Sequence, residues 1–113
     1  MDTFIVAYVR SGTGLSTAEV QRISEAIAPF NPEWVQIVSP YGLLFLFTAE
    51  ADLSRKLTET LNKACAASGG VELQYGLAEG ELIVRRDNGG RVSGQPMGTA
   101  INRAIEEAAR KAT

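Results

Sequence analysis

Two nearly uninterrupted apolar runs constrain the fold of this chain more than any other feature. Residues 3–9 read TFIVAYV and residues 43–48 read LLFLFT, and neither run contains a charged side chain. Runs of β-branched, aromatic and aliphatic residues of this length are typical of strands buried within a sheet. We therefore expect two buried strands, the second of them central in the sheet.

Two amphipathic helices are predicted to follow these runs. Ser16 and Glu19 have the spacing of a capping box, so the first helix begins there. An Asn-Pro pair at residues 31–32 ends it. In the second helix, residues 51–67, an apolar side chain recurs at every fourth position, and the Gly-Gly pair at residues 69–70 follows it.

The remaining segments complete the order of elements. A third helix is predicted from about Thr99, and turn signals occur at residues 39–42 (SPYG) and 87–90 (DNGG). Further strands are predicted at residues 34–38, 71–77, 81–86 and 91–94. The order is βαββαβ with an added C-terminal hairpin and helix. It predicts one α+β domain over residues 1–113 with a ferredoxin-like core, in which two helices pack on one face of an antiparallel sheet.

Composition excludes several classes of function. The chain contains no histidine, which removes the commonest general base near neutral pH, the His-containing catalytic triads and all His-based metal sites. The net charge is −2, and the basic clusters are only the pairs at residues 85–86 and 110–111, so we expect no nucleic-acid partner. We also expect no catalytic residue, no metal and no cofactor.

The cysteine count and the apolar segments of the sequence indicate the cellular location. Cys65 is the single cysteine, so the chain has no intrachain disulfide, which fits a reducing compartment. The N-terminal segment lacks the basic region of a signal peptide, and no stretch approaches the roughly 20 apolar residues of a membrane span. We therefore expect a cytoplasmic protein without a membrane partner.

Two motifs in the C-terminal third resemble one protein family. Residues 73–81 read LQYGLAEGE, and residues 98–104 read GTAINRA. The first is similar to the strand-and-turn pattern of class III nucleotide cyclases, and the second to the Gly-x-x-Val-Asn-x-Ala helix start of that family. The diguanylate cyclase domain is a second choice with a similar core, but its Gly-Gly-Asp/Glu-Glu-Phe hairpin is missing here.

The chain departs from this family at the positions that carry the chemistry. The resemblance implies two metal-binding aspartates, but these positions fall near Arg10 and Tyr41. Asn102 matches the family's asparagine and is a candidate ligand contact, with an ordinary polar residue near a helix start as the alternative. The arginine expected four residues later is Glu106, whose carboxylate would repel a triphosphate. The resemblance thus implies a cyclase homology domain with a degenerate active site.

For several other residues, a structural role is a simpler interpretation than a functional one. Gly12 and Gly14 fit a plain turn better than a phosphate-binding loop, because a P-loop lysine is missing. Cys65 is expected to be a buried structural thiol. Asp87 fits a hairpin turn. Three aromatic side chains near the first hairpin are expected in the core, with an exposed interface anchor as the alternative: Phe30, Trp34 and Tyr41.

Three functions remain open at this point. The favoured hypothesis is a non-catalytic interaction or signalling module that forms a homodimer or binds a regulatory protein. The alternatives are a nucleotide cyclase, or half of one, whose partner supplies the metal-binding residues, and a sensor of a nucleotide or another small ligand.

Overall fold

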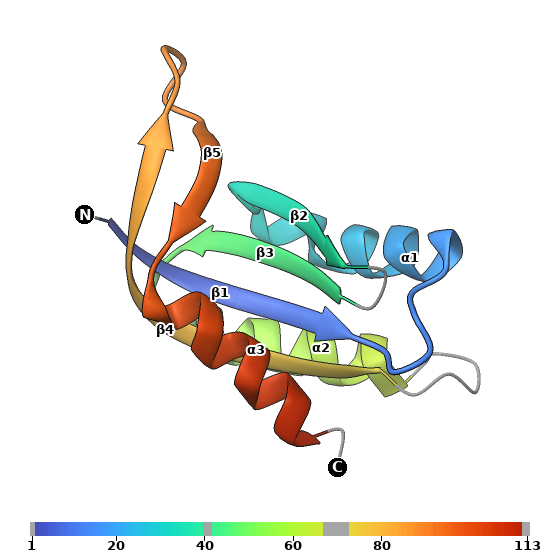
Figure 1. Cartoon of the computed structure of the whole chain (residues 1–113). Helices are drawn as coiled ribbons and strands as arrows, with labels where there is room; N and C mark the ends of the chain where they lie inside the picture. The colour runs from blue at the N-terminus through green and yellow to red at the C-terminus, as the bar shows by residue number, and fades with distance from the viewer. Residues whose placement is uncertain (1, 40–41, 67–72, 112–113) are drawn as a thin grey trace.

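Five antiparallel strands form a single sheet in the computed structural model, which describes residues 2–39, 42–66 and 73–111 (Figure 1). The strands are β1 (Asp2–Arg10), β2 (Trp34–Ser39), β3 (Gly42–Thr48), β4 (Gln74–Arg86) and β5 (Val92–Met97). The helices are α1 (Thr17–Ile27), a short 3-10 turn η1 (Ala28–Phe30), α2 (Leu53–Ala66) and α3 (Thr99–Lys111). The predicted α+β class and the order of helices and strands through α2 are confirmed.

The two apolar runs occupy the middle of the sheet. The strand order is β2-β3-β1-β4-β5, so β1 and β3 each have a strand on both sides. They pair in a register that runs from Phe4 opposite Thr48 to Arg10 opposite Gly42. Every residue from Phe4 to Val9 is buried. The central position predicted for residues 43–48 is confirmed.

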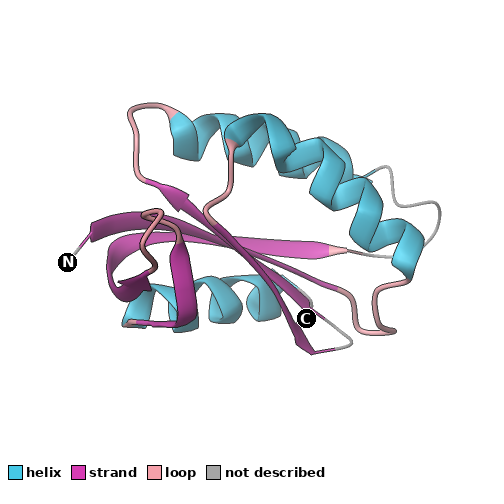
Figure 2. Cartoon of the chain, turned by 90° about the horizontal axis from the view of Figure 1, so that it is seen from above, coloured by secondary structure: helices cyan, strands magenta, loops and turns pink. Residues whose placement is uncertain are grey.

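Each face of the sheet carries a separate hydrophobic cluster. On one face, α1 and α2 cover alternate residues of β1 and β3, including Ile5 and Phe45. On the other face, α3 and the start of β5 cover Phe4, Val6 and Leu44. Figure 2 shows helices on both sides of the sheet. The two helices predicted for one face are therefore α1 and α2, and α3 occupies the face opposite to them.

The sheet is nearly closed into a barrel, because its two edges bend toward each other. β4 continues well beyond β1 and turns back through residues 87–90 into β5 (Figure 1). The turn is the predicted one: Asp87 Oδ1 accepts hydrogen bonds from the backbone amides of Gly89 and Arg91. The pairing of β4 with β5 shifts between Ile83 and Arg85, and this irregularity bends the hairpin.

One predicted boundary is wrong. The sequence pattern predicts two strands, at residues 71–77 and 81–86, with a break at Glu79-Gly80. In the structure β4 runs without interruption from Gln74 to Arg86 and pairs with β1 across this point, with Gly80 opposite Phe4. The glycine accommodates α3 rather than a turn: a Cβ on Gly80 would lie 3.2 Å from Ala100 Cβ and 2.9 Å from the end of the Arg103 side chain.

Other local predictions hold with small shifts. α1 has Ser16 as its N-cap and the predicted capping box with Glu19. α2 begins two residues later than expected. The predicted Gly-Gly helix end at residues 69–70 lies outside the described residues. None of the helices in the described part of the chain combines the length and hydropathy that a membrane crossing requires.

Candidate functional site

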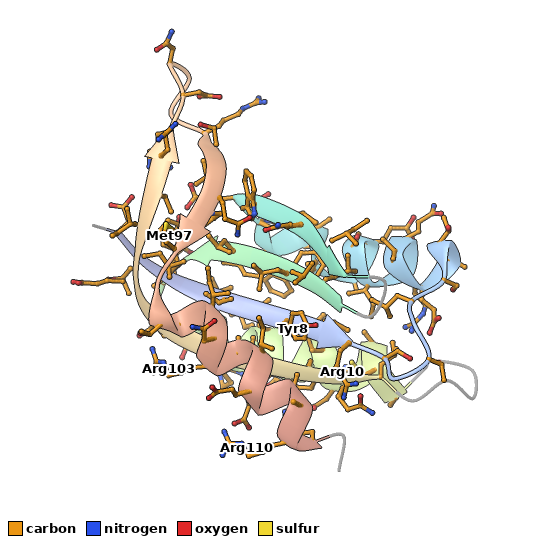
Figure 3. The ribbon with its side chains drawn as sticks, viewed as in Figure 1. Tyr8, Arg10, Met97, Arg103 and Arg110 are labelled. Atoms are coloured by element: carbon orange, nitrogen blue, oxygen red, sulfur yellow. The ribbon has the colours of Figure 1, made fainter. Side chains whose placement is uncertain are left out.

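The end of β1 carries Arg10, where the resemblance implies a metal-binding aspartate. Arg10 lies opposite Gly42 of β3 and Gln74 of β4 and is half-buried (Figure 3). Its guanidinium lies close to the loop that follows β1: a Cβ added to Gly12 would be 3.9 Å from Arg10 Nη2. This position therefore holds a cation. Tyr41, the second departure from the family pattern, lies outside the described residues.

Asn102 and Glu106 lie one turn apart on the solvent side of α3. Both are exposed, and neither makes a hydrogen bond or ion pair within the described part of the chain. The opposite side of the helix is a stripe of buried alanines, including Ala104, that faces β1 and β4. The structure thus shows Asn102 as a surface residue, and Glu106 as a carboxylate on the same surface.

Small residues on both sides let α3 approach β4 closely. A Cβ on Gly76 would lie 2.1 Å from the backbone oxygen of Ala104 and 2.7 Å from the amide nitrogen of Ala108. Gly98, just before α3, is equally confined, because its Cβ would lie 2.5 Å from Leu82 Cδ2. The glycines that carry the family resemblance therefore have a packing role in this chain.

The structure does not bring Arg10 and Asn102 together within one chain. The start of α3 lies beside Gly80, which pairs with Phe4 near the beginning of β1. Arg10 is at the other end of that strand. Figure 3 shows Arg10 well apart from Arg103, the neighbour of Asn102 on the same helix. Among the described residues no group of three or more histidine, cysteine, aspartate or glutamate side chains has the geometry of a metal site.

The loop between β1 and α1 is a turn rather than an open anion site. Gly14 has a φ of 90°, and its amide donates to the Ser11 oxygen at 3.2 Å. At the start of α1, Ser16 Oγ accepts from the Glu19 amide, and the Glu19 carboxylate accepts from the Ser16 amide. The capping box places a negative charge where a phosphate would have to bind, which favours the plain-turn reading.

The aromatic residues of the first hairpin are mainly part of the core. Trp34 is half-buried against the cluster beneath α3, and Phe30 is half-buried against the cluster beneath α1 and α2. Asp87 serves the hairpin turn, as described above. Two apolar patches lie outside the core instead: one on β2, with Val35 and Ile37, and one on the β4–β5 hairpin, where Ile83 pairs with Met97.

A cavity that the sequence pattern did not indicate lies between the end of α2, the start of β4 and the end of α3. Its volume is about 370 Å³. The polar residues that line it are Asn62, Cys65, Gln74, Tyr75 and Lys111. No spacing rule connects these residues, because they belong to three separate elements that only the tertiary fold brings together.

The residues that line this cavity differ in how many of their polar atoms have a hydrogen-bond partner. Tyr75 donates from its hydroxyl to Asn62 Oδ1 at 2.5 Å, and the Lys111 ammonium lies 3.9 Å from the centre of the Tyr75 ring. Gln74 is only 8% exposed, and its Oε1 has no hydrogen-bond partner. Cys65 is half-buried rather than fully buried as expected, and burial raises the pKa of its thiol, while Arg22 and Lys111 act against that rise.

A larger and more open polar hollow, of about 580 Å³, lies near η1 and the start of α2. Its charged residues are Glu33, Glu50 and Lys56, and Glu33 is already paired with Arg86. No buried unpartnered side-chain atom belongs to its described wall. The cavity between α2, β4 and α3 differs in this respect, because its lining residue Gln74 has a buried Oε1 without a partner.

Neither a scan against models of protein families nor a search of curated proteins matched this chain. The functional assignment therefore depends on the residues and the geometry described above.

Proposed function

We propose that the chain is a non-catalytic interaction module that forms a homodimer and resembles a nucleotide cyclase homology domain. The observation that carries the proposal is the apolar surface on β2. Val35 and Ile37 are 50% and 67% exposed, and they lie on the same side of the strand because side chains alternate along it. β2 is an edge strand that pairs only with β3. Exposed apolar residues on a sheet edge are typical of an interaction surface.

The occupant that best fits this surface is a second copy of the chain. A symmetric dimer brings the same patch of both copies together, so the patch must be complementary to itself. A twofold axis that passes beside Gln36 places Val35 of one copy against Ile37 of the other, so the two copies meet through this face of β2. The patch has no charge of its own, so two copies of a chain with net charge −2 meet there without direct repulsion.

The position of Gln36 is compatible with this arrangement. Gln36 belongs to the opposite face of β2, because its partner in the register is Leu44, which lies in the cluster beneath α3. Its side chain donates to Gln95 there. A second copy packing on Val35 and Ile37 therefore leaves that hydrogen bond in place.

The charges at the family's functional positions support the non-catalytic part of the proposal. Arg10 places a cation where cyclases need a carboxylate to hold a metal ion. Glu106 places a carboxylate where they need a cation for the triphosphate. Both changes act against binding of a metal-nucleotide complex, so we infer that the scaffold serves association rather than phosphoryl transfer.

We also propose a ferredoxin-like core for the segment from β1 to β4. The order β2-β3-β1-β4, with α1 and α2 on one face, supports this assignment. The long curled end of β4, with β5 and α3, is then an addition to that core. We place the protein in the cytosol, in keeping with the single cysteine Cys65.

Sedimentation equilibrium of the full chain and of two matched variants tests the homodimer. We expect the wild-type chain to be a dimer and Ile37→Lys to be a monomer, because a buried, unpaired lysine opposes the contact. Ile83→Lys introduces the same charge at a residue that is 63% exposed on the other patch, and it should remain a dimer. A wild-type monomer at high concentration, or an equal effect of both variants, contradicts the proposal.

A separate assay tests the absence of catalysis. The chain is incubated with ATP or GTP and Mn²⁺, and cyclic nucleotide is measured by chromatography. We expect no product above the rate without protein. Product that depends on the protein would overturn the non-catalytic assignment while leaving the homodimer untouched.

A further inference from the structure

We propose that the open edge of β4 binds an extended segment of a partner protein, which adds as a strand and carries an acidic residue two positions before an apolar one. The pairing of β4 with β1 ends where Asp2 meets Leu82, but β4 continues to Arg86. Figure 1 shows this end of β4 extending beyond β1, with β5 beside it. Among the described residues, no strand borders residues 83–86 on the β1 side. Such an edge offers unpaired backbone N–H and C=O groups to another chain.

The hydrogen bonds of β1 show which way the backbone of Leu82 faces. The Thr3 carbonyl accepts from the amide of Ala49, so at Thr3 the backbone of β1 faces away from β4. The hydrogen-bonding direction alternates from one residue to the next along a strand. Asp2 therefore directs its N–H and C=O groups at β4, and its partner Leu82 directs its own groups at β1.

The same alternation applies to the part of β4 that extends beyond β1. Val84 and Arg86 follow Leu82 by two and four residues, so their backbone groups face the open edge. The Asp87 amide donates to the Arg91 carbonyl at 2.9 Å, which shows that Asp87 faces β5 and agrees with this alternation. An added strand that continues the line of β1 in the same direction would thus form backbone hydrogen bonds with Val84 and Arg86.

The side chains at this edge favour an apolar residue in the partner. Ile83 is 63% exposed, and it pairs with Met97 of β5, which is exposed to the same extent. A partner residue opposite Ile83 extends this apolar row to a third strand, and cross-strand pairs of this kind stabilise a sheet. A hollow of about 370 Å³, lined in part by Leu82 and Val84, has room for the side chain of the preceding partner residue.

The charges of the β4–β5 hairpin favour an acidic residue in the partner. Residues 83–97 contain three arginines and one aspartate, although the net charge of the whole chain is −2. Arg86 is already paired with two carboxylates of the fold. Arg85 is exposed and forms no ion pair within the described part of the chain. In an antiparallel partner strand, the residue opposite Arg85 comes two positions before the residue opposite Ile83, which gives the order acidic-x-apolar.

Fluorescence anisotropy of a labelled peptide tests this site. The probe is the synthetic peptide Thr-Ser-Glu-Val-Ile-Ser-Thr, whose Glu, Val and Ile would lie opposite Arg85, Val84 and Ile83. We expect saturable binding with a Kd of about 1 mM or below, and roughly tenfold weaker binding when Lys replaces the Glu of the peptide. Ile37→Lys, the variant designed to break the homodimer, should bind the peptide as the wild type does, because β2 is not part of this site.

N-methylated peptides test whether the partner binds through its backbone. Methylation of the Val amide removes the N–H group that would donate to the Val84 carbonyl, so binding should be lost. The Ile amide of the peptide faces away from β4, so its methylation should leave binding nearly unchanged. Amide hydrogen exchange gives a second readout: the peptide should slow exchange at Val84 and Arg86, but not at Asp87, which is already bonded to Arg91.

Two charge variants connect the binding to the hairpin. Arg85→Glu should weaken binding of the Glu peptide by roughly tenfold or more, because it replaces an attraction with a repulsion, and it should improve binding of the Lys peptide. Lys63→Glu makes the same change of charge at an exposed position on α2 and should bind both peptides as the wild type does.

Four results would overturn the proposal. The first is that the Glu peptide does not bind. The second is that the peptide methylated at Val binds as well as the unmodified one, which would show that no strand is added. The third is that Arg85→Glu and Lys63→Glu respond alike. The fourth is that exchange at Val84 slows as the protein concentration rises without peptide, which would identify the occupant of this edge as a second copy of the chain.

Discussion

Gln36 Nε2 donates a hydrogen bond of 2.9 Å to Gln95 Oε1 and so joins the two edge strands of the sheet, β2 and β5. The residues are 59 positions apart in the sequence. Arg86 forms a second link, since it pairs with Asp2 at 2.7 Å and with Glu33 at 3.0 Å. These polar contacts hold the sheet in its nearly closed shape. They are at the surface, so each contributes little to the stability of the fold as a whole.

This arrangement predicts that Gln95→Ala separates the hairpin from β2 without unfolding the domain. The free energy of unfolding should fall by about 1 kcal/mol or less, since one exposed hydrogen bond is lost. Backbone amides of β5 should nevertheless exchange faster with deuterium, because the hairpin opens locally. Urea denaturation and hydrogen exchange measure the two effects. The matched control is Gln21→Ala on α1, which also removes an exposed side-chain hydrogen bond and should leave β5 unchanged.

The packing of α3 on β4 predicts a large effect of one added methyl group. In Gly76→Ala the new Cβ would lie 2.1 Å from the Ala104 backbone oxygen, so the helix must move away from the sheet. We expect a loss of about 2–3 kcal/mol in the free energy of unfolding, as for other overpacked cores. Gly12→Ala is the control, because its Cβ meets only the flexible end of Arg10 at 3.9 Å. Equal stability of the two variants would contradict this account of the interface.

The break predicted in β4 shows where local sequence information fails. Glycine weakens an isolated strand, so the pattern around Gly76 and Gly80 indicates a strand end. In the folded chain the same glycines fit beneath Ala100, Ala104 and Ala108. The gain from that contact involves residues about 25 positions away, and a window of ten residues does not contain it.

Elements with a complete local signal are the ones that the sequence predicts well. The capping box of Ser16 and Glu19, the turn at residues 87–90 and the uncharged run at residues 43–48 each carry their own physical reason within a few residues. The candidate cavity has no such signal. Lys111 and Gln74 meet there only because α3 crosses β4, and no periodicity in the sequence encodes that crossing.

The ion pair of Asp2 with Arg86 predicts a specific dependence of stability on pH. The hydrogen bond from Arg86 lowers the pKa of Asp2 from its ordinary value of 3.8. A carboxyl group whose pKa is lowered in the folded state stabilises the fold above its unfolded pKa and loses that contribution as the pH falls through the folded pKa. Wild type should therefore be more stable than Asp2→Asn at pH 5, and the difference should shrink below pH 3.8.

Urea denaturation of both proteins between pH 5 and pH 2.5 measures that difference. Glu25→Gln, which alters an exposed carboxylate on α1 by the same charge, serves as the control. The idea is refuted if the wild-type advantage over Asp2→Asn grows as the pH falls, or if it is unchanged across the range.

The surroundings of Cys65 predict a shift in the reactivity of its thiol. Burial raises the pKa of Cys65 above its ordinary value of 9.0, and the positive charges of Arg22 and Lys111 oppose the rise. Because the thiolate is the reactive form, alkylation by iodoacetamide should be slow at neutral pH and should increase at a higher pH than for an exposed cysteine. Lys111→Met removes one opposing charge, so its rate profile should move to still higher pH. Lys63→Met should leave the profile where it is in the wild type, and a Lys111→Met profile that coincides with it would show that Lys111 does not act on the thiol.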